Sequence, residues 1–232
     1  MSDSKIIVAL DYPDASGALA FARQVTPEAC RLKIGKELFT AEGPDLVRKL
    51  VDDGFELFLD LKFHDIPNTV NKAIAAACRL GVWMVNVHAL GGQQMMLAAR
   101  QAIEDSDSSK PLLIAVSILT SAGAEQLAQI GLSGSVEDNV QRLSGLALDS
   151  GVDGMVCSAQ EAASLRRHFG DQPVLVTPGI RPAGASSDDQ QRIMTPTQAI
   201  AAGASYLVIG RPITQHVNPL QALQDINQSL QQ

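Results

Sequence analysis

The segment 60–69 places side chains of opposite charge at the end of an apolar run. Asp60 and Lys62 close the run, and Asp65 follows three residues later. Side chains two apart share one face of a strand, so we expect Asp60 and Lys62 to point to the same side, away from the leucines between them. We also expect Asp65 to lie within reach of Lys62. Charged groups beside an apolar interior are rarely left unpaired or unused, so this spacing predicts chemistry on a charged substrate.

The composition is typical of a compact enzyme. The chain has 232 residues, of which 46% are apolar, and chains of this length often fold as one α/β barrel. We therefore expect one domain over residues 1–232. Its 18 basic and 25 acidic residues give a net charge of −7, which argues against nucleic-acid or membrane-surface partners. Any anionic ligand would have to be bound by local cations.

The cysteines and the N-terminus indicate a cytoplasmic location. Cys30, Cys78 and Cys157 are odd in number and form no Cys-x-x-Cys pair, which suits a reducing compartment and small buried side chains. The first residues carry no signal-peptide pattern, and no apolar run approaches the roughly 20 residues that a membrane helix needs.

Short β-rich runs alternate with amphipathic segments along the chain. The expected strands are 5–10, 31–34, 56–62, 83–88, 112–119, 154–157, 174–177 and 206–209. The expected helices include 44–53, 68–80, 93–104, 136–150, 159–169 and 197–202. Eight βα units in this length predict a closed (β/α)8 TIM barrel. The alternative is an open doubly wound sheet, but no Gly-x-Gly-x-x-Gly follows the first strand.

The ends of the expected strands carry a coherent set of polar residues. Active sites of such barrels lie at the C-terminal ends of the strands. The polar residues there are Asp11, Lys33, Asp60, Lys62, Thr120 and Arg211, with 178–181 after the seventh strand. Barrel phosphate sites commonly use the loops after strands seven and eight, where Gly210 would admit a phosphate and Arg211 would donate to it. We therefore expect a phosphorylated substrate.

Five segments together resemble one enzyme family. They are 8–11, 32–35, 60–69, 177–181 and 210–214. In combination they are similar to the bacterial-type orotidine 5′-phosphate decarboxylases, whereas the Asp-x-Lys-x-x-Asp core alone is shared with related sugar-phosphate enzymes. The resemblance implies a homodimeric barrel that converts orotidine 5′-monophosphate (OMP) to uridine 5′-monophosphate (UMP) and CO2. This is the last step of de novo pyrimidine synthesis, and the family carries it out without a metal or organic cofactor.

The resemblance also implies a role for each polar residue. Lys62 would stabilise the electron pair left on C6 and then donate the proton, within a cluster completed by Asp60, Asp65 and Lys33. Asp11 and Lys33 would hold the ribose hydroxyls, with Lys33 also ordering Asp60, and Thr120 would lie against the pyrimidine. The residues matching the phosphate end are Arg181, Gln190, Gly210 and Arg211.

Two further features follow from the same resemblance. Residues 181–192 have the composition of a lid over the phosphate. Asp65 and Thr69 match positions that reach into the neighbouring subunit's site.

Other interpretations of the charged residues stay open. A magnesium-dependent decarboxylase or aldolase acting on a sugar phosphate would use Asp60 as a metal ligand. A non-catalytic nucleotide-binding protein would keep the pocket without the chemistry. A single Asp or Lys at a strand end is commonly only a cap or a salt bridge. The four histidines show no metal-like spacing, so we assign no metal.

Overall fold

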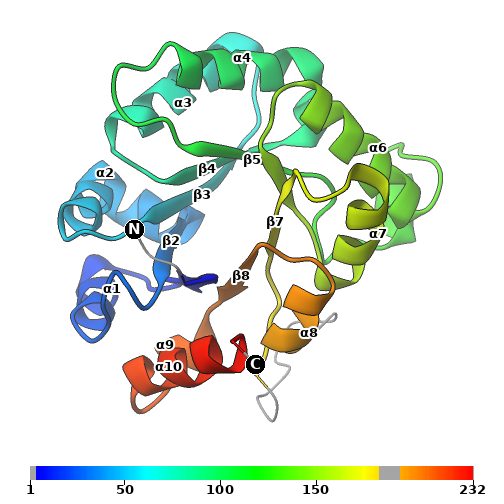
Figure 1. The fold of residues 1–232 in the computed structure, drawn as a ribbon. Coiled ribbons are helices and arrows are strands. Elements are labelled where there is room, and N and C mark those ends of the chain that lie inside the picture. Colours follow the sequence, from blue (N-terminus) through cyan, green and yellow to red (C-terminus); the bar gives the residue numbers. More distant parts are fainter. Residues whose placement is uncertain (1–3, 183–193, 232) are drawn as a thin grey trace.

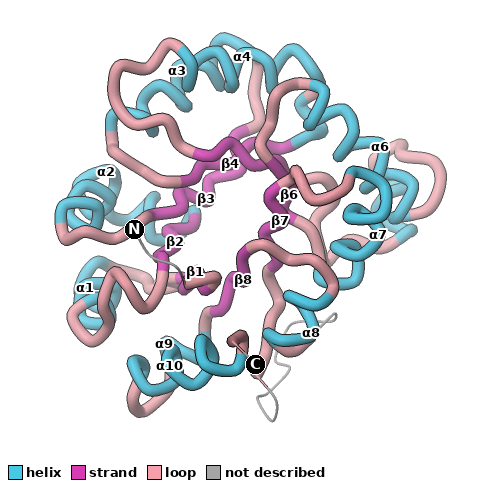
Figure 2. Tube along the Cα trace, viewed as in Figure 1, coloured by secondary structure: helices cyan, strands magenta, loops and turns pink. Residues whose placement is uncertain are grey.

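Eight parallel strands form a closed barrel in the computed structural model, which describes residues 4–182 and 194–231 (Figures 1 and 2). The strands pair in sequence order and β1 closes on β8, so the (β/α)8 prediction is confirmed and the open-sheet alternative is wrong. The strands are β1 (Ile6–Ala9), β2 (Arg31–Gly35), β3 (Leu57–Phe63), β4 (Met84–His88), β5 (Leu112–Val116), β6 (Gly154–Val156), β7 (Val174–Thr177) and β8 (Tyr206–Ile209).

Helices surround the barrel and return the chain to the start of each next strand (Figure 2). They are α1 (Ala15–Ala22), α2 (Lys36–Asp52), α3 (Pro67–Arg79), α4 (Gln93–Glu104), α5 (Ala124–Gln129), α6 (Val136–Asp149), α7 (Ala159–Phe169), α8 (Pro196–Ala201), α9 (Arg211–Thr214) and α10 (Pro219–Ser229), with a 3-10 turn η1 (Ala89–Gly91). Among the described residues, no helix combines the length and the apolar character needed to cross a bilayer.

Most expected helices agree with the structure to within one residue, but one does not. The helix expected at 44–53 begins at Lys36 and is broken at Gly43, whose φ of 66° interrupts the helical backbone just before Pro44. The strand expected at 112–119 ends at Val116, because the chain then leaves the sheet and Leu119 becomes 48% exposed.

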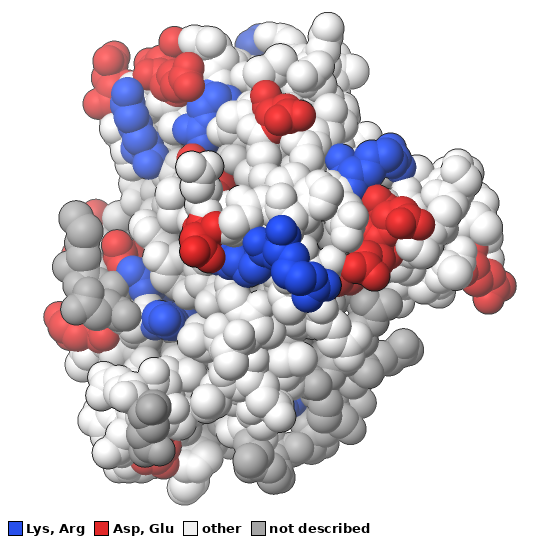
Figure 3. Space-filling view, turned by 45° about the vertical axis from the view of Figure 1, so that its right-hand side comes forward, with Lys and Arg blue, Asp and Glu red and all other residues white. Residues whose placement is uncertain are grey.

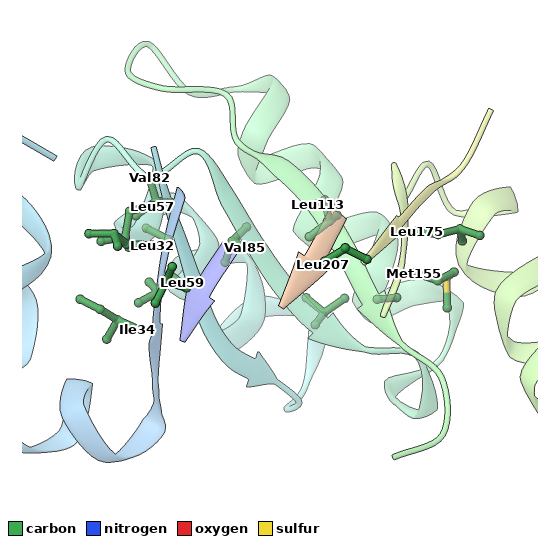
Figure 4. Close-up of a cluster of buried hydrophobic side chains, with 14 of the residues drawn as sticks. Leu32, Ile34, Leu57, Leu59, Val82, Val85, Leu113, Met155, Leu175 and Leu207 are labelled. Carbon is green, nitrogen blue, oxygen red and sulfur yellow. The ribbon is translucent and has the colours of Figure 1, made fainter. Parts of the chain in front are cut away.

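Two apolar clusters lie on the two sides of the strands. The inner cluster fills the barrel and contains Ile7, Ala9, Phe58, Met84, Ile114, Val176 and Val208. The outer cluster packs strands against helices and includes Leu32, Ile34, Leu57, Leu59, Val85 and Leu113 (Figure 4). Because Leu57 and Leu59 face outward and Phe58 faces inward, the next inward position on β3 is Asp60.

The N-terminal end of the barrel is closed by a buried cation. The Arg31 guanidinium lies 4.5 Å from the ring centroid of Trp83 and 4.9 Å from that of Tyr206. It also pairs with Glu56 at 2.9 Å and donates to the backbone carbonyl of Ser4. Cation–π contacts and a paired charge make this end of the barrel a stability element, at the opposite end from the polar strand termini.

The end of β3 departs from a regular strand. Leu59 pairs with Val85 and Phe63 pairs with Val87, so the register with β4 shifts between these pairs. Within the shift, Lys62 has a φ of 53°, which a side-chain-bearing residue rarely adopts. The side chains of Asp60 and Lys62 nevertheless meet, as expected, although the backbone between them is not a regular strand.

Candidate active site

A row of alternating charges crosses the C-terminal end of the first three strands. The Lys33 ammonium lies 3.5 Å from a carboxylate oxygen of Asp11 and 3.4 Å from one of Asp60. The Lys62 ammonium lies 2.6 Å from the other oxygen of Asp60. The Lys33 and Asp60 side chains are only 9% and 13% exposed, whereas that of Asp11 is 68% exposed. The row therefore runs from solvent at Asp11 into the barrel mouth.

A cavity of about 200 Å³ opens above the inner cluster and meets this row. Its lining residues are Lys33, Phe58, Asp60, Lys62, Val116, Ile118, Leu119, Thr120, Val156, Val176, Pro178 and Val208. Charges lie on the β2–β3 side and apolar side chains form most of the other walls. A flat ring can pack against such walls while a charged substituent faces the lysine, and water-poor surroundings strengthen that interaction.

The Asp60 carboxylate is held by three donors from three strands. One oxygen accepts from Lys62 at 2.6 Å and from the Asn86 side-chain amide at 2.7 Å. The other faces the Lys33 ammonium. The carboxylate in turn fixes the ends of two flexible lysine side chains, so the positions of both ammonium groups are set before any ligand binds.

Three of the four residues expected at the phosphate end follow β7 and β8. Gly210 precedes α9, and a Cβ atom on it would lie 3.6 Å from a carboxylate oxygen of Asp11, so the ends of β8 and β1 are adjacent. Arg211 begins α9 and is partly exposed. Arg181 is buried and donates to the carbonyl of Ile180 at 3.0 Å. Gln190 and most of the expected lid lie outside the described residues.

Comparisons with known proteins identify the family of this chain. The family model described as "Orotidine 5'-phosphate decarboxylase / HUMPS family" matches residues 4–226. The chain belongs to this family. An orotidine 5'-phosphate decarboxylase of Vibrio cholerae is 57% identical over 230 residues, covering 99% of this chain and all of the relative. One of Hydrogenovibrio crunogenus is 59% identical over 228 residues, covering 98% of this chain and 96% of the relative.

A solved structure extends the likeness to the fold. The crystal structure of orotidine 5'-phosphate decarboxylase from Lactobacillus acidophilus superimposes with a TM-score of 0.88 at 36% identity. It covers 98% of this chain and 99% of that chain. The resemblance inferred from the sequence is thereby confirmed at the level of family and fold.

Two residues expected in this family's site, Asp65 and Thr69, are exposed at the surface of the chain. Asp65 is exposed, and its carboxylate accepts from the next backbone N–H, of Ile66, at 2.6 Å. Among the described residues it forms no ion pair with Lys62 within 4.0 Å, so its expected place near the lysine stays a prediction. Thr69, in the first turn of α3, is exposed as well.

Asn86 also belongs to this charged cluster, although it was not among the residues expected there. It is fully buried on β4, and its amide contacts both Asp60 and the backbone of Lys62. A signal was present, because it is the one amide in the apolar run 84–87 and shares the inward face with Met84. A buried polar residue in a strand requires partners, and the nearest candidates were those of the preceding strand.

Two histidines pack against each other beside the cluster. The rings of His64 and His88 stack with centroids 5.5 Å apart. Burial, then the nearby His64, Lys36 and Lys62, lowers the pKa of His88 to about 4. Its Nδ1 accepts a long hydrogen bond from the Leu90 N–H at 3.5 Å. Within the described residues, no three His, Cys, Asp or Glu side chains are grouped as metal ligands.

Proposed function

We propose that this chain removes the C6 carboxylate of OMP as CO2 and releases UMP, with Lys62 as the stabilising ammonium and the proton donor to C6. Membership of the orotidine 5′-phosphate decarboxylase family supports the reaction. The observation that supports Lys62 is its ammonium in a mostly apolar cavity, 2.6 Å from a fixed carboxylate. The reaction makes this chain a carbon–carbon lyase of pyrimidine nucleotide synthesis.

The electronic demand of the reaction explains a preorganised lysine. When CO2 leaves, the electron pair on C6 occupies an orbital in the plane of the pyrimidine, so the ring cannot delocalise it. Stabilisation must then come from charge already placed in the site, which needs no reorganisation during the reaction. An ammonium supplies that charge and then its proton, so Lys62 can serve in both steps.

The charges of the row fit a substrate whose negative charge moves away during the reaction. Asp11, Lys33, Asp60 and Lys62 sum to zero, so the OMP carboxylate adds an uncompensated negative charge near Asp60. Departure of CO2 removes that charge, and relief of the repulsion would lower the barrier. Most of the effect is assigned to the ammonium, because electrostatic preorganisation is usually the larger contribution.

The remaining residues bind the parts of the nucleotide that do not react. Asp11 and Lys33 would hold the ribose hydroxyls and Thr120 would pack against the base. Arg181, Gln190, Gly210 and Arg211 would bind the phosphate. Binding energy from this remote group can be realised at the transition state, so its loss would lower turnover as well as affinity.

A second copy of the chain completes the site in this proposal. Asp65 and Thr69 are exposed, and the adjoining surface carries Ile66 at 66% exposure. Leu97, on the neighbouring α4, is 46% exposed. Apolar side chains at such exposure are typical of a surface that a partner covers. A homodimer through this face would deliver Asp65 to the partner's lysine.

A cytoplasmic location is part of the same proposal. Cys30, Cys78 and Cys157 are all buried free thiols. Burial raises the pKa of Cys30 and of Cys157 to about 12, which keeps these thiols unreactive. Cell fractionation with an activity assay would test this location.

One assay separates this function from its alternatives. The purified protein is mixed with OMP, with and without EDTA, and the fall in absorbance as UMP forms is followed. Turnover that survives chelation supports the proposal, whereas loss that magnesium restores supports the metal-dependent sugar-phosphate enzyme. UMP binding without turnover would instead indicate a nucleotide-binding protein.

In the same assay, the Lys62→Ala variant should lose activity by many orders of magnitude and still bind UMP. A modest loss of activity would show that Lys62 is not the proton donor.

A further inference from the structure

We propose that Asn86 is a positioning residue for this reaction. Its side-chain amide holds the Asp60 carboxylate and the backbone of Lys62 together, so it sets where the Lys62 ammonium lies. The inference deepens the proposed function and depends on it.

The register between β3 and β4 shows why an amide is needed at this point. Leu59 pairs with Val85 and Phe63 pairs with Val87, so residues 60–62 of β3 lie opposite Asn86 alone. A strand with extra residues bulges, and its ladder of backbone hydrogen bonds is interrupted there. The Lys62 N–H donates instead to Oδ1 of the Asn86 side chain at 2.7 Å.

The backbone that this hydrogen bond holds is strained. Among the described residues, Lys62 is the only one other than glycine with a positive φ. Such a conformation is unfavourable for a residue with a side chain. It persists only where the surroundings stabilise it, and strain of this kind gathers at functional sites. The Asn86 hydrogen bond is the stabilising contact, and it acts directly on the residue that carries the ammonium.

The other end of the same amide acts on the carboxylate. Nδ2 of Asn86 donates to Asp60 Oδ1 at 2.7 Å, the same oxygen that accepts from the Lys62 ammonium at 2.6 Å. The backbone N–H of Lys62 is thus held by Oδ1 of Asn86, and its ammonium is held by the Asp60 carboxylate. Only a neutral side chain with both a donor and an acceptor can do this, because a carboxylate would repel Asp60 and an apolar group would leave the N–H without an acceptor.

Asn86 is buried inside the barrel, where its polar neighbours are the charged residues of the cluster. It is 0% exposed and faces into the barrel. The charged groups near it are Asp60 and Lys62 of β3, with Lys33 of β2 reached through Asp60. On the β5 side it pairs with the apolar Ile114. Asn86 therefore does not need to touch the substrate, and its effect passes through Asp60 and Lys62.

The first test is Asn86→Ala in steady-state OMP decarboxylation. It removes one neutral hydrogen bond and one to a charged group, so kcat should fall by about 30-fold or more. KM for OMP and the dissociation constant of UMP should stay within about threefold, because no nucleotide contact is lost. Val85→Ala is the matched control, since it truncates the neighbouring β4 residue, which faces the outer cluster. It should lower thermal stability and leave kcat unchanged.

The second test is Asn86→Asp, which keeps the size of the side chain and uses pH as the readout. At high pH the introduced carboxylate repels Asp60 and offers it no donor. When it takes up a proton, it can donate to Asp60 and accept from the Lys62 N–H, as the amide does. The ratio of variant kcat to wild-type kcat should therefore rise as the pH falls. A merely structural role predicts a ratio that does not depend on pH.

The outcomes separate this proposal from the function on which it depends. Wild-type protein without activity on OMP would overturn the proposed function. Active wild type with Asn86→Ala at wild-type kcat, or with losses shared equally by Val85→Ala, would overturn the role of Asn86 alone. If Asn86→Ala does not fold, Asn86→Asp decides, and a pH-independent kcat ratio would overturn the proposal.

Discussion

Replacing Asp60 with asparagine should separate the orientation of the lysine from the binding of substrate. Asp60→Asn preserves shape but removes the negative charge that the Lys62 ammonium contacts at 2.6 Å. A hydrogen bond between charged groups contributes about 1.5–3 kcal/mol, and 1.36 kcal/mol corresponds to tenfold in rate. We therefore expect kcat for OMP to fall by about 10- to 150-fold.

The same substitution should not weaken substrate binding. The row Asp11, Lys33, Asp60 and Lys62 changes from a net charge of zero to +1, so the OMP carboxylate meets less repulsion. KM should stay unchanged or fall. The assay is steady-state decarboxylation analysed separately for kcat and KM, with thermal unfolding to verify the fold.

A surface substitution of the same type controls for the chemical change. Asp45→Asn removes a carboxylate that pairs with Arg48 on α2, where the Asp45 side chain is 90% exposed, so it should leave kcat unchanged. An Asp60→Asn variant with kcat within threefold of wild type, or one whose whole effect is a rise in KM, would show that Asp60 does not orient the Lys62 ammonium for the reaction.

Three more predictions concern the pH response, the assembly and the N-terminal end of the barrel. His88 has a folded pKa of about 4 against an ordinary value of 6.5, so only the unfolded state binds its proton between these values. Thermal stability should fall as the pH falls from 6.5 to 4, and His88→Gln should flatten that slope; an unchanged slope would contradict it. Mixing inactive Lys62→Ala and Asp65→Ala subunits should restore activity, because one hybrid site keeps both residues, and no recovery after verified exchange would assign Asp65 to its own chain. Arg31→Met should lower the free energy of unfolding by about 3–5 kcal/mol, because it leaves the Glu56 carboxylate unpaired. The double variant Arg31→Met with Glu56→Leu should recover much of this loss. Equal losses for the single and the double variant in denaturant titrations would contradict the prediction.

The barrel and most of its charged residues could be predicted because their signals are local. Apolar β-rich runs alternate with amphipathic helices, and this pattern leaves few topologies for eight strands. Asp60 follows the outward Leu59 and the inward Phe58, so its direction could be derived from simple alternation. Lys33 and Thr120 also proved to line the cavity expected at the strand ends.

The features that were missed depend on contacts between distant segments. The bulge that turns Lys62 exists only in the register of β3 against β4, and the role of Asn86 follows from that register. Asp65 is close to Lys62 in sequence, but it lies in the turn that leads into α3, where it accepts from the Ile66 N–H, so sequence distance alone does not fix its position. Local spacing cannot encode such geometry, because it depends on which strand pairs with which and in what alignment.

The proposed role of Lys62 requires that its ammonium lie next to the carbon that loses CO2. A crystal structure with bound UMP measures this directly through the distance from Lys62 Nζ to C6 of the pyrimidine. We expect a separation of about 3–3.5 Å, as for groups aligned to react, with the nitrogen still paired to Asp60. An Nζ turned away from C6, or a pyrimidine bound outside the cavity, would contradict it.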